Sequence, residues 1–152
     1  MTDNRPNWKE YFMGMAKQAS TRSSCIRANV GVVIVDKDNR VVATGYNGTP
    51  YKVESCLERG YCFRIANNIK SGTMYEKCRS IHAELNAILQ AGIHETRGCD
   101  MYLYGHSFCC IQCKRAIVQA GIVNVYLQKD ETSEIVCYTV DEFKKELDEE
   151  VL

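Results

Sequence analysis

Two short segments carry residues whose types and spacing suit metal chemistry. One is His-Ala-Glu at 82–84 and the other is Cys-Ile-Gln-Cys at 110–113. Each is expected to begin a helix, and a helix N-terminus lowers the pKa of a thiol and favours the thiolate that a metal requires. His82, Cys110 and Cys113 would supply three ligands and leave a fourth tetrahedral position for water, which is the arrangement of a catalytic zinc rather than a structural one.

Glu84 follows His82 by two residues on the same expected helix, so its side chain projects in a different direction. A carboxylate placed there can contact the water without binding the metal. It can take the water proton, pass it to a ring nitrogen and then protonate a leaving amine. Zinc lowers the pKa of a bound water towards ~7, which makes such proton transfer feasible at neutral pH. The pair of segments therefore indicates hydrolysis assisted by zinc.

The pattern of expected helices and strands that must position these residues indicates an α/β fold. A short Asp/Asn-rich turn joins the first two expected strands, which predicts an antiparallel hairpin. Later strands alternate with helices and are expected to run parallel. We expect a three-layer α/β/α domain with a central mixed sheet of about five strands, and an active site at the strand ends that precede the two motif helices. The expected helices are 8–20, 81–91, 110–119 and 141–149, and the expected strands are 31–35, 41–46, 100–104, 122–127 and 135–140.

The composition places these elements in a single domain, residues 1–152. The chain is 45% hydrophobic with nine cysteines, and its 19 Lys+Arg balance its 19 Asp+Glu, so it has no electrostatic footprint for a nucleic-acid polymer. No stretch approaches the ~20 apolar residues of a membrane span. The first ten residues lack the apolar core of a signal peptide, so we expect a cytoplasmic protein whose cysteines are metal ligands or buried thiols.

From about residue 5 to residue 127 the chain resembles the deoxycytidylate (dCMP) deaminases of the cytidine deaminase-like superfamily. His-x-Glu followed by Cys-x-x-Cys is the signature of zinc-dependent nucleobase deaminases. The segments GYNGTP (45–50) and HAELNAI (82–88) are similar to the deoxycytidylate branch. The resemblance implies that Glu84 shuttles the proton and that Asn47 binds the deoxyribose. It implies that the catalytic zinc is held by His82, Cys110 and Cys113.

The reaction implied by this resemblance is hydrolytic deamination of a cytosine deoxynucleotide, dCMP to dUMP with release of ammonia, which feeds thymidylate synthesis. Water attacks ring atom C4, Glu84 protonates N3 and then helps the amine leave, and backbone near Ala83 and the start of the Cys110 helix holds the base. Members of the family form dimers or hexamers. Many are regulated by dCTP and dTTP, with the GYNG segment taking part in some.

Two departures from the family pattern bear on the site. The family reads Pro-Cys-x-x-Cys, and here Cys109 stands in the proline position. The x-x spacing to Cys113 selects Cys110 as the ligand and leaves Cys109 as a neighbour. The segment before the motif is also longer than in many members, with the additional residues around 105–108 on the expected lip of the pocket. His106 either faces the nucleotide there or is a surface loop histidine. Because this lip is altered, the alternative substrate is dCTP, or both dCMP and dCTP.

Four further cysteines flank an irregular insert, residues 51–79. The insert has weak periodicity and few core-forming residues, and a closed four-thiolate zinc would order it. The resemblance favours this reading because several dCMP deaminases carry a second, structural zinc in this region, whereas the alternative is a set of unrelated buried thiols. The four candidate ligands are Cys25, Cys56, Cys62 and Cys78.

Basic residues near the expected pocket mouth are candidates for the phosphate of the nucleotide. They are Arg22, Arg27 and Lys52. An arginine suits a phosphate because its planar fork donates two hydrogen bonds. Arg27 is the first choice, because the chain turns directly from it into the first strand. The alternative interpretation is that each of these residues is a solvated charge on the surface.

Two other functions compete with deamination of a small nucleotide. An RNA or tRNA base is disfavoured as the target by the neutral charge and by the GYNGTP segment. A zinc-stabilised binding module without catalysis is disfavoured because Glu84 is present.

Overall fold

A single five-stranded sheet forms the centre of the computed structural model, which describes residues 2–149. The spatial order of its strands is β2-β1-β3-β4-β5. β1 pairs antiparallel with both β2 and β3, whereas β3 and β4 run parallel. The mixed sheet expected from the sequence is therefore confirmed. The strands are β1 (Gly31–Val35), β2 (Val41–Tyr46), β3 (Asp100–Tyr104), β4 (Asn124–Gln128) and β5 (Val136–Thr139).

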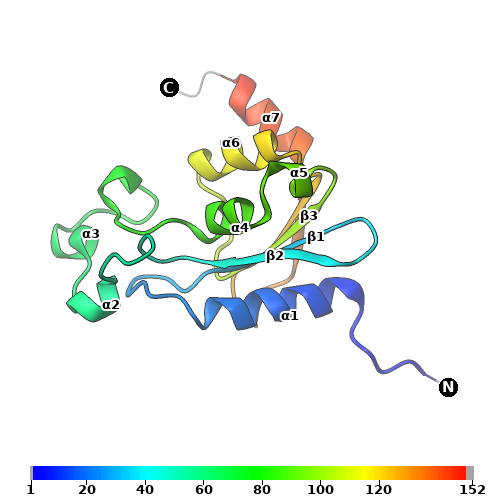
Figure 1. Ribbon diagram of the computed structural model, residues 1–152, viewed down its shortest axis with the longest axis horizontal. Helices are drawn as coiled ribbons and strands as arrows, with labels where there is room; N and C mark the ends of the chain where they lie inside the picture. Colours follow the sequence, from blue (N-terminus) through cyan, green and yellow to red (C-terminus); the bar gives the residue numbers. More distant parts are fainter. Residues whose placement is uncertain (1, 150–152) are drawn as a thin grey trace.

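Helices cover both faces of this sheet (Figure 1). All five residues of β1 are buried, and its alternate side chains join two separate cores. Val33 belongs to the same core as Phe12 of α1 on one face, and Ile34 belongs to the same core as Ile117 of α6 on the other. The three-layer α/β/α architecture is confirmed. The helices are α1 (Trp8–Ser20) on the first face and α4 (Ala83–Ala91), α5 (Ile93–Thr96), α6 (Ile111–Ala120) and α7 (Val140–Asp148) on the second.

The expectation that the later strands all run parallel is wrong for β5, which pairs antiparallel with β4. The reason lies in the connections. α6 lies between β3 and β4 and supplies the crossover that a parallel pair needs, whereas residues 129–135 join β4 directly to β5 without a helix. A short link of that kind returns the chain alongside itself in the opposite direction.

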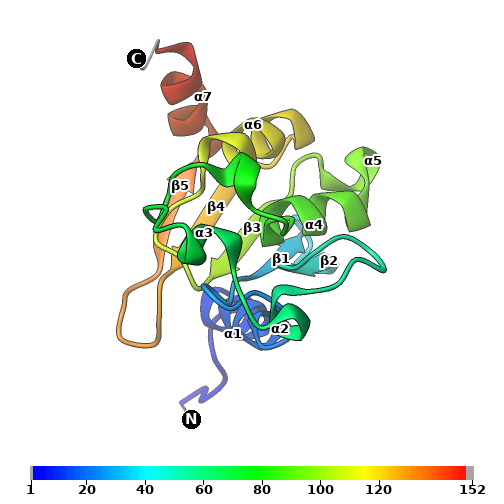
Figure 2. The ribbon, with the colours of Figure 1, turned by 90° about the vertical axis from the view of Figure 1, so that its left-hand side faces the viewer.

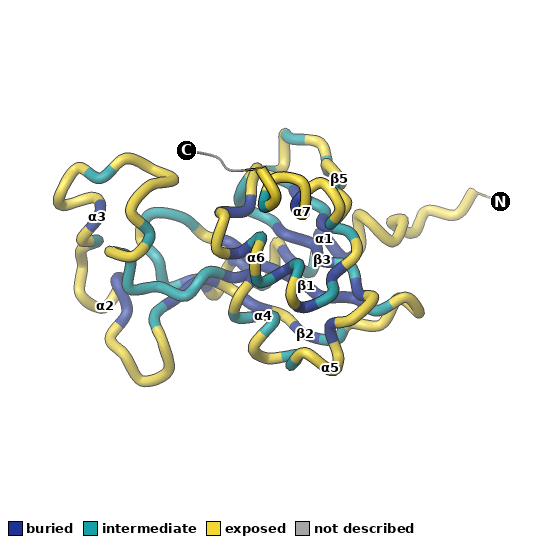
Figure 3. The backbone as a smooth tube through the Cα atoms, turned by 90° about the horizontal axis from the view of Figure 1, so that it is seen from above, coloured by how far each residue is buried: buried dark blue, intermediate teal, exposed yellow. Residues whose placement is uncertain are grey.

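The insert at residues 51–79 stands apart from the sheet in Figure 1, lies in front of it in the view of Figure 2, and is largely exposed in Figure 3. It contains only short elements, as its weak periodicity predicts. The two ends of the insert are brought together where Gly48 and Ile81 exchange backbone hydrogen bonds of 3.2 and 2.7 Å. The elements are α2 (Cys56–Arg59), α3 (Phe63–Ala66) and the 3-10 helix η1 (Tyr75–Lys77).

Within residues 2–149, no helix combines the length and the apolar character that crossing a membrane would require.

Candidate active site

The two motifs meet where α4 and α6 begin. His82 is the N-cap residue of α4 and Cys110 is the N-cap residue of α6. The His82 Nδ1 atom lies 3.3 Å from Cys113 Sγ and 3.5 Å from Cys110 Sγ. In the described part of the chain, these three residues form the only group of potential metal ligands whose donor atoms all lie within 4.8 Å of one another.

This group fits a zinc ion. A tetrahedral zinc with sulfur at ~2.3 Å and nitrogen at ~2.0–2.1 Å holds those two ligand atoms about 3.5 Å apart, which agrees with the separations from Nδ1 to both sulfurs. The Cys110 Sγ also accepts a hydrogen bond from the Cys113 backbone nitrogen at 3.4 Å. A hydrogen bond from the Cys113 side chain lowers the pKa of the Cys110 thiol, which favours the thiolate that binds metal. The hydrogen bond with Cys110 is also the main factor that raises the pKa of His82.

Glu84 lies beside the ligands in the first turn of α4. It is only 5% exposed, and it lines the same pocket as His82 and Cys110. Burial raises the pKa of its carboxyl group, because an apolar setting penalises the charged form. Ala83, fully buried between Glu84 and His82, places the first backbone groups of α4 on the pocket wall. The arrangement has three potential metal ligands and a separate buried carboxyl group that can exchange a proton.

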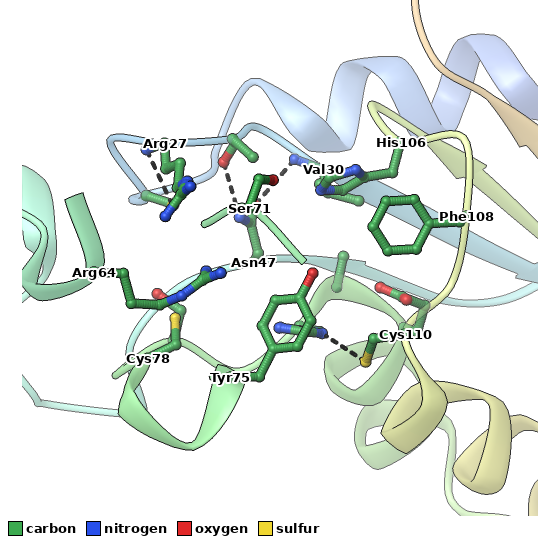
Figure 4. A pocket seen from close by; sticks show the side chains of 16 residues that line it. Arg27, Val30, Asn47, Arg64, Ser71, Tyr75, Cys78, His106, Phe108 and Cys110 are labelled. Atoms are coloured by element: carbon green, nitrogen blue, oxygen red, sulfur yellow. Dashed lines mark hydrogen bonds between the residues drawn. The ribbon is translucent and has the colours of Figure 1, made fainter. Parts of the chain in front are cut away.

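Three other residues predicted from the sequence also line this pocket: Arg27, Asn47 and His106 (Figure 4). Asn47 is 7% exposed, and it holds the loop before β1, since its Oδ1 accepts from Val30 N at 3.0 Å and its Nδ2 donates to Ala28 O at 2.8 Å. The His106 ring lies edge-on to Phe108, with 5.3 Å between ring centroids. Burial lowers the pKa of His106. These side chains come from loops at the same end of the sheet, before β1, after β2 and after β3.

Arg22 and Lys52 are not brought to this pocket. They line a separate hollow together with Gly48 and Asn86. The segment that follows β2 separates the active-site pocket from this hollow, because Asn47 lines the pocket whereas Gly48 and Thr49 line the hollow. The expectation that Arg22 and Lys52 lie near the pocket mouth is therefore corrected.

The four cysteines around the insert line one neighbouring pocket together: Cys25, Cys56, Cys62 and Cys78. Burial is the main factor that raises the pKa of Cys56, and electrostatic interaction with the other three cysteines raises it further. Within residues 2–149 their sulfur atoms do not converge within 4.8 Å as the atoms of the His82 group do. Cys109 is buried and lies outside that group, and burial raises the pKa of its thiol well above the usual value.

Several residues that line the pocket were not predicted from the sequence, and two of them on the insert have side chains suited to a functional role. Arg64 is buried on α3, and Tyr75 begins η1 and packs edge-on against the His82 ring, with 4.7 Å between ring centroids. No motif marks either residue, because the surrounding segment has neither helical nor strand periodicity. Their roles depend on how the insert folds back over the pocket.

Comparisons with known proteins agree with this geometry. The family profile described as "Cytidine and deoxycytidylate deaminase zinc-binding region" matches residues 6–129. The deoxycytidylate deaminases of Schizosaccharomyces pombe and Saccharomyces cerevisiae are 44% and 43% identical to this chain over 121 residues, or 80% of the chain. The chain spans only 37% of the length of each yeast relative.

A solved structure shares both the fold and part of the sequence. It is the dCMP deaminase of the cyanophage S-TIM5 in complex with dCMP and dUMP, which is 25% identical, with a TM-score of 0.58 over 82% of this chain and 83% of the phage chain. The zinc-ligand group, the fold and the family match agree with one another. The chain belongs to the cytidine and deoxycytidylate deaminase zinc-binding family.

Proposed function

We propose that this protein is a zinc-dependent enzyme that deaminates dCMP to dUMP and releases ammonia. The observation that carries the proposal is the approach of His82 Nδ1 to within 3.3 and 3.5 Å of two cysteine sulfurs, beside the buried carboxylate of Glu84. The yeast relatives that are deoxycytidylate deaminases and the phage enzyme in complex with dCMP and dUMP support the choice of substrate.

The catalytic zinc would be held by His82, Cys110 and Cys113. When bound, it supplies Lewis-acid activation of a water molecule. Glu84 accepts a proton from this water as the water oxygen bonds to ring atom C4, and delivers it to N3. It then delivers the second water proton to the exocyclic amine, the C4–N4 bond breaks, and ammonia leaves. General acid–base transfer of this kind contributes about 10²–10⁴-fold in rate.

The other residues lining the pocket orient the nucleotide. Asn47 Nδ2 already donates one hydrogen to Ala28 O, and its second amide hydrogen is available for an oxygen of the deoxyribose. Backbone near Ala83 holds the edge of the base, and His106 with Phe108 forms an aromatic wall opposite. Arg27 binds the phosphate.

The test is an ammonia-release assay on the zinc-loaded protein with dCMP, dCTP, deoxycytidine and cytidine. We expect dCMP to be the best substrate. Turnover of the nucleosides alone would overturn the assignment to nucleotides, and a preference for dCTP would favour the reading based on the longer 105–108 lip. If none of the four compounds released ammonia, the protein would be a zinc-binding module without this activity.

We also propose that the chain binds a second, structural zinc through Cys25, Cys56, Cys62 and Cys78. The proposal is supported by their placement around one pocket, and it requires the insert to draw the sulfurs closer together when metal binds. Metal analysis should then find about two zinc ions per chain. A Cys56→Ser, Cys62→Ser double variant should retain about one and become sensitive to proteolysis within 51–79, while a wild-type value near one would reject the site.

Effector binding and self-association complete the proposal. The hollow lined by Arg22, Lys52 and the GYNGTP segment apart from Asn47 is the place we propose for dCTP or dTTP, because it offers two cations and backbone groups separate from the active site. Homo-oligomers, dimers or hexamers, are favoured by apolar residues exposed on α4, among which Leu89 is 65% exposed. Sedimentation with and without dCTP or dTTP measures the oligomeric state and its response to these nucleotides. The cytoplasmic location stays a prediction from the sequence.

A further inference from the structure

Arg64 is a buried cation with no counter-ion in the described part of the chain. It is only 6% exposed, and it takes part in none of the ion pairs found among residues 2–149. Its Nη2 donates to Thr73 O at 2.9 Å and, more weakly, to Lys70 O at 3.5 Å, whereas its Nε is buried without a hydrogen-bond partner. Buried charges are costly unless they are paired, so this arrangement predicts an anion that completes it.

A second guanidinium lines the same pocket from a different segment. Arg27 lies in the loop before β1, and its Nη1 is likewise buried without a partner. In Figure 4 the side chains of Arg27 and Arg64 both extend into one end of the pocket, whereas Cys110 and Phe108 lie at the other end. Among the described residues, Glu84 is the only acidic residue that lines this pocket; both arginines also line the neighbouring pocket, which contains Glu76.

We propose that Arg64 binds the 5′-phosphate of the substrate together with Arg27, and that it thereby determines the preference for a nucleotide over a nucleoside. The inference rests on the proposed function, because it takes the base to lie at the metal end of the pocket. A phosphate at the opposite end would accept hydrogen bonds from both guanidinium groups. Arg79 also has a buried unpartnered Nη1, but it lines only the neighbouring pocket, which contains Glu76.

The surroundings of Arg64 hold its guanidinium in place for this role. The Arg64 Cζ lies 4.7 Å from the centroid of the Tyr75 ring, in a cation–π contact. Tyr75 in turn packs edge-on against His82, so the phosphate end and the metal end of the pocket share one aromatic residue. Loss of Arg64 could therefore disturb His82 through Tyr75, and an experiment must separate that structural effect from loss of phosphate binding.

A comparison of dCMP with deoxycytidine separates the two effects, because deoxycytidine lacks only the phosphate and would respond only to a structural disturbance of the site. We expect Arg64→Gln to raise KM for dCMP and lower kcat/KM about 10- to 100-fold, the usual loss for a charge-assisted hydrogen bond, with turnover of deoxycytidine changed less than about twofold. Arg64→Lys should recover part of the loss. A loss of similar size on both substrates, or on neither, would overturn the inference.

Arg59→Gln is the matched control. Arg59 lies on the same insert, but it pairs with Glu54 and lines the neighbouring pocket instead of the active-site pocket. This variant should leave the ratio of dCMP to deoxycytidine turnover at the wild-type value. An equal change of the ratio in Arg59→Gln would show that the whole insert, and not Arg64, sets the preference.

Equilibrium binding separates this inference from the proposed function. Calorimetry of the zinc-loaded protein with inorganic phosphate and with dUMP should show binding that weakens about tenfold or more in Arg64→Gln. If the protein releases no ammonia but shows this weakening, the deaminase proposal fails and the anion site stands. If it deaminates dCMP and Arg64→Gln binds both probes as the wild type does, the role of Arg64 is refuted.

Discussion

Gly45 is a position where strand β2 closely approaches the start of helix α4. The Cβ of an alanine at 45 would lie 2.5 Å from the Ala83 carbonyl oxygen and 2.6 Å from the Ala87 nitrogen. Both are backbone atoms of α4, so neither can rotate away. The helix start would have to move by about 0.5 Å or more to restore a tolerable contact, and catalytic groups lose their geometry at displacements of about that size. Gly45→Ala therefore tests whether the strand holds the metal ligands in place.

The magnitude follows from overpacking. Forcing additional atoms into a packed interior costs about 1–3 kcal/mol, and in a domain of this size ~1 kcal/mol lowers Tm by about 2–4 °C. We therefore expect Gly45→Ala to lower Tm by roughly 3–10 °C. His82 immediately precedes α4 and is displaced with its first turn, so zinc affinity and dCMP turnover should fall as well, the latter about tenfold or more.

Thermal unfolding and zinc retained after dialysis against a chelator measure the two effects. The control is Gly14→Ala in the middle of α1, where a Cβ meets nothing within 4 Å. That change should stabilise the protein by about 0.5–1 kcal/mol, because alanine favours the helix, and should leave zinc unaffected. If Gly45→Ala kept the wild-type Tm, the close approach would be refuted. A lower Tm with unchanged zinc retention would refute the link between β2 and His82.

Three further tests, which use four substitutions, have expected outcomes. Cys110→Ser should abolish catalytic zinc binding whereas Cys109→Ser should keep it, and metal analysis showing the reverse would reject the ligand assignment. Ile117→Ala removes a fully buried side chain between α6 and the sheet and should cost about 2–5 kcal/mol in urea unfolding, so a cost below about 1 kcal/mol would contradict its place in the core. Thr96→Val removes the hydroxyl that donates to Ala120 O at 2.7 Å and should cost about 1–3 kcal/mol, and unchanged stability would show that this carbonyl finds another partner.

Local signals in the sequence predicted the scaffold well. The range of α1, Trp8–Ser20, agrees with its helical periodicity, and Asn7 caps it by accepting a hydrogen bond from Glu10 N at 2.8 Å. The uninterrupted apolar run at 31–35 predicted a strand, and the structure shows that all five residues of β1 are buried. The direction of β5 differs from the expectation, because strand propensity does not encode direction and the link from β4 to β5 contains no crossover helix.

The site was predictable only where its chemistry is local. The spacing from Cys110 to Cys113 and their position at a helix start identified a ligand pair, and its convergence with His82 is what the structure adds. Arg64 could not be found in the same way, because nothing in an irregular segment marks an arginine as buried and unpaired. Arg22 was placed near the pocket by its position in the chain, but the exit of β2 puts it in a different hollow.

The most direct test of the central claim is dCMP turnover per bound zinc in Glu84→Gln. The substitution keeps the size of the side chain and removes its capacity to accept and carry a proton, while His82, Cys110 and Cys113 remain in place. We predict a zinc content equal to that of the wild type and a fall in kcat of about 10²–10⁴-fold. Turnover close to the wild-type value with zinc bound would contradict the role of Glu84, and loss of the zinc would show that this residue belongs to the metal site itself.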